Sequence, residues 1–206
     1  MLMHPEILSE QQLHLLPFVK SLSKEYYLVG GTAIALHIGH RRSIDFDLFK
    51  NGPIDKERLA QRLREHGLAF QLLFANSEGF HVSVEGVKLT FFQFPFDIPA
   101  KMTFEGIHIP DLLHLAAMKS YALGRRAKWK DYLDLYFILH DYFSLNTVST
   151  KAESLFSNLF SPKLFRQQLC YFDDVDYTEE VTFLPGYEVS ETEVRAFLTN
   201  TATDRL

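Results

Sequence analysis

The sequence contains one cysteine, Cys170, among its 206 residues. A single thiol cannot close an intramolecular disulfide, and a free cysteine most often packs as a small apolar residue in a reducing compartment. Apolar runs long enough to cross a membrane are also missing. The first twenty residues carry Glu6 and Glu10 and lack the basic start and apolar stretch of an export signal. We therefore expect a cytoplasmic protein without a membrane span.

Positive charge is scarce as well, with 21 Lys and Arg residues against 26 Asp and Glu residues and a net charge of −5. A protein coated with nucleic acid normally has a broad basic face, so that class is disfavoured. One local basic group surrounds Trp129, whose ring either stacks on an RNA base or is an ordinary surface aromatic. The acidic residues gather between residues 173 and 180, which is typical of a solvated loop. The basic group consists of Arg125, Arg126, Lys128 and Lys130.

The pattern of apolar residues divides the chain into an α/β half and a mainly helical half. Helical spacing predicts one helix or two short ones over residues 6–22, and helices over 32–38 and 55–66. Alternation predicts strands over 26–29, 43–49, 69–75, 80–84 and 87–94, with Glu85-Gly86 as a tight hairpin turn between the last two. Further helices are predicted over residues 111–124, 131–139, 150–169 and 189–198. The expected fold class is α/β (α+β), a small mixed sheet flanked by helices. Residues 1–100 form its core, and residues 101–206 are either a helical part packed on it or belong to one single domain.

Two glycines follow the first predicted strand, at Gly30 and Gly31. Glycine lets the backbone approach a ligand closely, and the N-terminus of the next helix offers free N–H groups and a positive dipole to a phosphate. Thr32 either caps that helix or adds a hydroxyl to the phosphate site. A Gly-Gly pair alone is also compatible with a simple turn.

An Asp-x-Asp pair, Asp45 and Asp47, lies on the next predicted strand, with Ile44, Phe46 and Leu48 on its opposite face. Residues i and i+2 of a strand lie ~6–7 Å apart on one face. In a partly dry cleft two such carboxylates repel by ~2–3 kcal/mol at an effective dielectric constant of ~20. A divalent cation removes this cost, and oxygen ligands suit Mg²⁺. The alternative is a hydrated strand face, but the glycine turn directly upstream favours a metal site.

The segment from Tyr27 to Phe49, YLVGGTAIALHIGHRRSIDFDLF, closely resembles the opening motif of the AbiEii/AbiGii toxin family. A second block resembles the family as well: Met118-Lys119, then Gly124-Arg125-Arg126, then residues 130–136 (KDYLDLY). Weaker similarity at residues 169–174 extends the match over nearly the whole chain.

The resemblance implies a nucleotidyltransferase fold and transfer of a nucleotide from a nucleoside triphosphate to an acceptor such as RNA or tRNA. It also implies Mg²⁺ or Mn²⁺ as cofactor and a toxin restrained by an antitoxin. By the family motif, Asp45 and Asp47 would bind the metal, and the phosphates would contact the turn. Lys119 and Asp131 match polar positions of the second block. The nucleotide-binding residues expected at the turn are Gly30, Gly31, Thr32, Arg42 and Ser43.

Lys119 has support from spacing alone, because it follows Leu112, Leu115 and Ala116 on the inward face of its helix. A buried ammonium group needs an anion, which is either Asp131 or Asp134 of the next helix or a triphosphate.

The third carboxylate of such sites is missing from the strand over residues 87–94, where Thr90 stands at the expected position. Three readings therefore remain open. The chain is an active nucleotidyltransferase, a descendant that only binds a nucleotide or a partner, or a phosphotransferase or nuclease that reuses the metal site.

Overall fold

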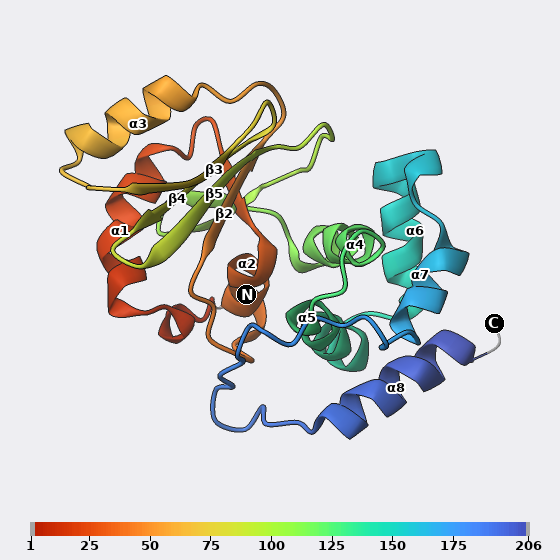
Figure 1. The fold of residues 1–206 in the computed structure, drawn as a ribbon. Coiled ribbons are helices and arrows are strands. Elements are labelled where there is room, and N and C mark those ends of the chain that lie inside the picture. Colours follow the sequence, from red (N-terminus) through yellow and green to blue (C-terminus); the bar gives the residue numbers. More distant parts are fainter. Residues whose placement is uncertain (1–2, 205–206) are drawn as a thin grey trace. The chain divides into compact units, whose positions relative to one another are not determined.

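A computed structural model describes residues 3–204, and it divides into two compact units, residues 1–111 and 112–206. Figure 1 shows the elements of both. No helix of the described residues is long and apolar enough to cross a membrane.

The first unit is built on a five-stranded mixed sheet with the strand order β1-β2-β5-β4-β3. Strand β2 pairs with β5 in parallel, and the other pairs are antiparallel. This arrangement confirms the mixed sheet expected from the sequence. The strands are β1 (Tyr27–Val29), β2 (Phe46–Lys50), β3 (Gln71–Ala75), β4 (Gly79–Val84) and β5 (Val87–Gln93).

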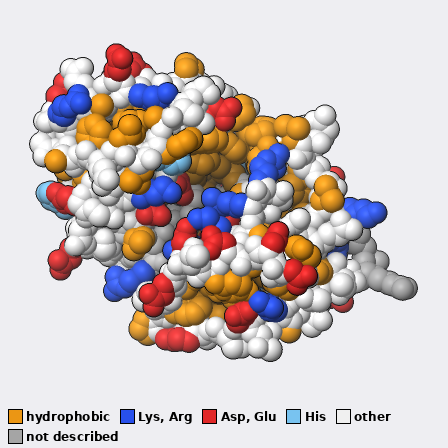
Figure 2. All heavy atoms as spheres, in the orientation of Figure 1, with side chains coloured by type: hydrophobic (Ala, Val, Ile, Leu, Met, Phe, Trp, Pro, Cys, Tyr) orange, Lys and Arg blue, Asp and Glu red, His pale blue; other side chains and the backbone are white. Residues whose placement is uncertain are grey.

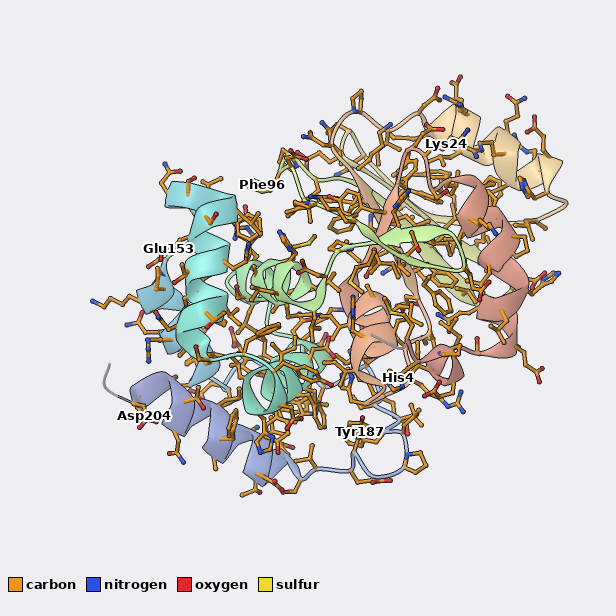
Figure 3. All side chains as sticks on the ribbon, turned by 180° about the vertical axis from the view of Figure 1, so that it is seen from behind. His4, Lys24, Phe96, Glu153, Tyr187 and Asp204 are labelled. Atoms are coloured by element: carbon orange, nitrogen blue, oxygen red, sulfur yellow. The ribbon has the colours of Figure 1, made fainter. Side chains whose placement is uncertain are left out.

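Helices α1 (Glu10–Ser21) and α3 (Lys56–Glu65) lie along the sheet (Figure 1). Phe18 of α1 and Leu63 of α3 are fully buried, as are Phe46 and Phe91 on the strands. A short 3₁₀ helix, η1 (Pro5–Ile7), precedes α1. The backbone N–H of His4 beside it donates to Leu36 O at 2.9 Å, which ties the start of the chain to the end of α2 (Gly30–Ile38) (Figure 3).

Sequence reasoning missed a second hairpin, formed by β6 (Met102–Phe104) and β7 (Ile107–Ile109). Its turn, Glu105-Gly106, has positive φ angles of 50° and 83°, close to the 52° and 82° of the predicted turn at Glu85-Gly86. Two successive residues with positive φ are typical of a type I′ hairpin turn. The same Glu-Gly signal that predicts the first hairpin therefore also marks the second.

The second unit is helical, and Tyr187 lies in the connection between α7 (Pro162–Leu169) and α8 (Glu191–Thr203) (Figure 3). The helical pattern over residues 150–169 belongs to two α-helices with a short 3₁₀ helix between them. It is interrupted where Ser157 takes a φ of 49°, and a new helix begins at Pro162 with Ser161 as its N-cap. Proline suits a first turn because it has no N–H to leave unpaired. The elements are α4 (Leu112–Leu123), α5 (Trp129–Asp141), α6 (Leu145–Phe156), η2 (Ser157–Leu159), α7 (Pro162–Leu169) and α8 (Glu191–Thr203).

Candidate functional site

The glycine turn belongs to the first turn of α2. The helix begins at Gly30, with Val29 as N-cap and no side-chain cap, so the alternative in which Thr32 caps the helix is wrong. Gly30 has a φ of 72°, a left-handed conformation that costs energy for any residue with a Cβ atom. The backbone therefore turns sharply from β1 into α2.

The carboxylate of Asp47 lies against Gly30. A Cβ atom built on Gly30 would stand 2.1 Å from Asp47 Oδ2, so only glycine leaves room for this approach. Asp47 is half-buried on β2, and Val29 opposite it on β1 is the residue just before Gly30. The strand pairing thus places a carboxylate at the helix end where the dipole favours negative charge.

Thr32 holds the chain that leads into β2. Its buried hydroxyl lies 2.8 Å from Ser43 Oγ and also donates to the carbonyl oxygen of Asp45. The side-chain amide of Gln12 on α1 reaches the same carbonyl at 3.5 Å. Thr32 and Ser43, which the sequence assigns to nucleotide phosphates, therefore make contacts within the protein that fix the position of Asp45.

Of the two neighbouring arginines, Arg41 is the one at the glycine turn. A Cβ atom on Gly31 would stand 2.5 Å from one of its guanidinium nitrogens, and Arg41 is only 2% exposed. Its guanidinium also donates to the carbonyl of Arg42 at 3.1 Å. Arg42, the predicted nucleotide-binding residue, is exposed. Sequence reasoning did not single out Arg41, because nothing in the pattern shows which of two adjacent arginines turns inward.

Asp45 comes just before β2 rather than on it. The strand begins at Phe46, three residues later than predicted, and Ile44 is 57% exposed instead of facing the core. Asp45 is half-buried. Asp45 and Asp47 therefore do not form a simple i, i+2 strand pair, because the first of them belongs to the segment held by Thr32.

Three polar residues form a row across the sheet. Asp47 is opposite Thr90 on β5, and Thr90 is opposite His81 on β4. Residues directly opposite each other in a sheet project from the same face. Burial and the charge of Lys88 lower the pKa of His81. The Asp47 charge acts in the opposite direction but is outweighed. Thr90 thus occupies the position next to Asp47 where a third carboxylate was expected.

Asp45 and Asp47 are candidate oxygen ligands for a metal ion. Among residues 3–204, no group of three or more His, Cys, Asp or Glu side chains is arranged to hold a metal. Mg²⁺ in phosphoryl-transfer sites commonly takes only one or two carboxylates, and waters and substrate phosphates complete its shell. Asp45 and Asp47 meet that requirement but would hold a free ion weakly.

In the second unit, Lys119 of α4 is buried between two carboxylates of α5. Its Nζ lies 2.7 Å from Asp131 Oδ1 and 2.9 Å from Asp134 Oδ2. Arg126 adds a second cation, with its Nε donating to Asp131 Oδ2 at 2.8 Å. Lys119 is 5% exposed, Asp131 2% and Asp134 0%. Both aspartates that the sequence offers as partners for Lys119 therefore contact it.

These contacts decide the ionisation of the cluster. Burial by itself would lower the pKa of Lys119, but the charges of Asp131 and Asp134 raise it overall. Burial would raise the pKa of Asp131, but Lys119 and Arg126 hold it below its ordinary range. Both Lys119 and Asp131 are therefore charged at neutral pH.

Comparison with known proteins identifies the family. Residues 18–168 match the model of the family described as nucleotidyl transferase AbiEii toxin, Type IV TA system. The chain belongs to this family. The match includes the glycine turn, both aspartates of the Asp-x-Asp pair and the Lys119 cluster.

Individual proteins are similar to this chain over most of their length. The AbiEii chain is 28% identical over 176 residues to an uncharacterized protein of Aquifex aeolicus, with 81% of this chain and 84% of the relative aligned. Its fold matches MenT4, a nucleotidyltransferase toxin of Mycobacterium tuberculosis, with a TM-score of 0.60, 12% identity and coverage of 93% and 82%. JHP933 from Helicobacter pylori matches with a TM-score of 0.54, 18% identity and coverage of 95% and 91%. At these identities the solved structures establish the nucleotidyltransferase fold alone.

Proposed function

We propose that this AbiEii protein transfers a nucleotidyl group from a nucleoside triphosphate to a hydroxyl of an RNA acceptor such as tRNA, with Mg²⁺ or Mn²⁺ as cofactor. The family supports nucleotidyl transfer in general. The observation that carries the proposal is the approach of Asp47 to Gly30 at the start of α2. It brings a carboxylate ligand for a metal next to backbone N–H groups that suit a phosphate.

The proposed reaction is a displacement at the α-phosphorus. The acceptor hydroxyl oxygen forms a bond to that phosphorus, the bond to the α–β bridging oxygen breaks, and pyrophosphate leaves with the electron pair while the hydroxyl proton passes to water. A divalent metal, when bound, would neutralise phosphate charge. The protein contributes positioning and electrostatic stabilisation, which dominate phosphoryl transfer.

The residues divide into two kinds of role. We assign the metal-binding contacts to Asp45 and Asp47, and the contact with phosphates to the backbone at Gly30 and Gly31. Thr32 and Ser43 are positioning residues, because their hydroxyls hold the Asp45 segment. Lys119 and Asp131 act in the same reaction by the family resemblance, and exposed Arg42 is available to a substrate phosphate.

The biological setting is also a proposal. The family description supports a toxin with an antitoxin partner. The single cysteine supports action in the reducing cytoplasm. We further propose that residues 1–100 carry the nucleotide-binding core and that residues 101–206, which begin with the β6–β7 hairpin, form the mainly helical part. Limited proteolysis tests this division, since a cut near residue 100 that leaves two stable fragments supports it and cuts scattered along the chain contradict it.

The test is incubation of the purified chain with each of four α-labelled nucleoside triphosphates, Mg²⁺ and total cellular RNA. We expect label in RNA, and none with the Asp45→Ala/Asp47→Ala variant. Asp97→Asn, an exposed aspartate after β5, is the matched control and should keep activity. If the double variant labels RNA as well as the wild type does, the assignment of Asp45 and Asp47 is wrong.

A second candidate is a nucleotide-binding module without transfer activity, which the position of Thr90 opposite Asp47 favours. It predicts that nucleoside triphosphate binds in calorimetry and that no acceptor becomes labelled. Transfer to any RNA eliminates this candidate.

A further inference from the structure

The acidic segment of the second unit covers the basic group around Trp129. We call residues 125–130 the basic loop and residues 173–180 the acidic strap. The N–H of Asp176 donates to Ala127 O at 2.7 Å, and the N–H of Trp129 donates to Asp176 O at 3.0 Å. These bonds form a short parallel bridge between Lys128 and Asp176. The predicted solvated loop is thus exposed over much of its length but is attached to the basic loop through its backbone.

Two side chains of the strap contact the ammonium groups and the indole ring of the basic loop. The carboxylate of Glu179 pairs with the ammonium groups of Lys128 and Lys130, the latter at 3.3 Å. Two residues earlier, the ring of Tyr177 stacks on Trp129 with 5.3 Å between ring centres and 29° between planes. A single strap segment therefore presents one anion between two cations and one ring on an indole.

An anion next to a stacked ring is also what one nucleotide of a single strand presents. Proteins that bind single-stranded nucleic acid combine cationic side chains for the phosphates with aromatic side chains on which bases stack. We propose that Lys128, Trp129 and Lys130 form a binding surface for single-stranded RNA, and that Tyr177 and Glu179 occupy it in the free protein. The choice of RNA rests on the proposed function, whereas the contacts stand without it.

The position of the surface agrees with this role. Trp129 is the first residue of α5, and Asp131, which pairs with Lys119, is two residues further along. The other side of the strap is attached to α8, because the Tyr177 hydroxyl contacts Glu191 Oε1 at 3.1 Å and accepts from Arg195 at 2.5 Å. The strap is therefore held at both sides, and RNA must replace it. Figure 2 shows acidic and basic side chains interspersed on the face drawn.

The experiment measures binding of a short, labelled single-stranded RNA by anisotropy with the full chain, without nucleoside triphosphate or metal. We expect Glu179→Gln to bind RNA about three- to tenfold more tightly than the wild type, since each exposed ion pair is worth up to a factor of about five. The slope of log K against log salt should steepen by about 1.4, for two added phosphate contacts on a single strand. Glu180→Gln, the same charge change at the next exposed position, should change affinity less than about twofold.

Trp129 provides a second readout because it is the one tryptophan in the sequence. RNA should quench its fluorescence, more strongly in Glu179→Gln than in the wild type. Adding Lys128→Gln and Lys130→Gln to Glu179→Gln should abolish the gain. The proposal is overturned if Glu179→Gln binds RNA no more tightly than Glu180→Gln, if RNA leaves the Trp129 emission unchanged, or if a polyglutamate peptide competes as well as RNA. Because no nucleotide is transferred in this assay, its failure is distinct from failure of the proposed transferase activity.

Discussion

Replacing Lys119 by methionine tests the buried charge cluster most severely. The substitution keeps the volume and removes the ammonium group that lies 2.7 Å from Asp131 and 2.9 Å from Asp134. Removing one partner of a buried ion pair costs about 3–5 kcal/mol, because it leaves an uncompensated charge in the interior. Asp131 keeps its contact with Arg126 in this variant, and the loss arises because both buried carboxylates lose the ammonium group.

Urea unfolding followed by circular dichroism measures this loss. Lys119→Met should lower the free energy of unfolding by about 3–5 kcal/mol. The double variant Lys119→Met/Asp134→Asn should recover part of it, because the second substitution removes one of the two carboxylates that had lost the ammonium group. A loss below about 1 kcal/mol for Lys119→Met, in the range of a surface ion pair, would refute the reasoning.

The pH dependence of the same cluster has a definite sign. Asp131 has a folded-state pKa below the ordinary 3.8, so its contribution to stability is present above that pH and is lost as the pH falls below it. Lys119 has a folded-state pKa above 10.5, so its contribution is present below that pH and is lost as the pH rises through the folded value. Because the Lys119 charge helps to lower the pKa of Asp131, the deficit of the Lys119→Met variant should shrink as the pH falls below 3.8, where the wild type loses this contribution as well. A deficit that grows over this range would contradict the account.

Two further substitutions test the glycine turn and its support. Gly30→Ala should destabilise the protein by about 1–3 kcal/mol, because residue 30 has a left-handed backbone conformation that strains alanine. It should also abolish nucleotidyl transfer, because the new Cβ atom displaces the Asp47 carboxylate. Unchanged activity in this variant would exclude a role for that approach. Thr32→Val should cost about 1–3 kcal/mol in urea unfolding because it leaves the Asp45 carbonyl without its hydroxyl donor, whereas Thr32→Ser should cost less. A larger loss for Thr32→Ser than for Thr32→Val would show that the methyl group matters instead.

Local patterns were sufficient to predict most elements of the first unit. The Glu85-Gly86 turn and the strands beside it follow from alternation and turn chemistry, and the structure confirms that hairpin. The inward direction of Lys119 follows from helical spacing, and its predicted partners are both present. Each of these features depends on residues close together in the sequence or on a single helix face.

Features that depend on tertiary contacts were not accessible from one sequence. The late start of β2 follows from the hydrogen bond between Thr32 and the Asp45 carbonyl, which holds that residue outside the strand. Arg41 rather than Arg42 turns inward because Gly31 has no side chain and leaves space for the Arg41 guanidinium group. The row from Asp47 through Thr90 to His81 requires the strand register, so His81 carried no signal in the sequence.

The most direct test of the central claim compares α-labelled with γ-labelled nucleoside triphosphates on the wild type and Asp47→Asn, with RNA as acceptor. Nucleotidyl transfer predicts that RNA gains label from the α position only, with release of pyrophosphate, and that Asp47→Asn gains none. Label from the γ position would instead identify a phosphotransferase, and shortened RNA without label a nuclease. Either result, or equal labelling by Asp47→Asn, would contradict the assignment of Asp45 and Asp47 to a nucleotidyl-transfer site at the start of α2.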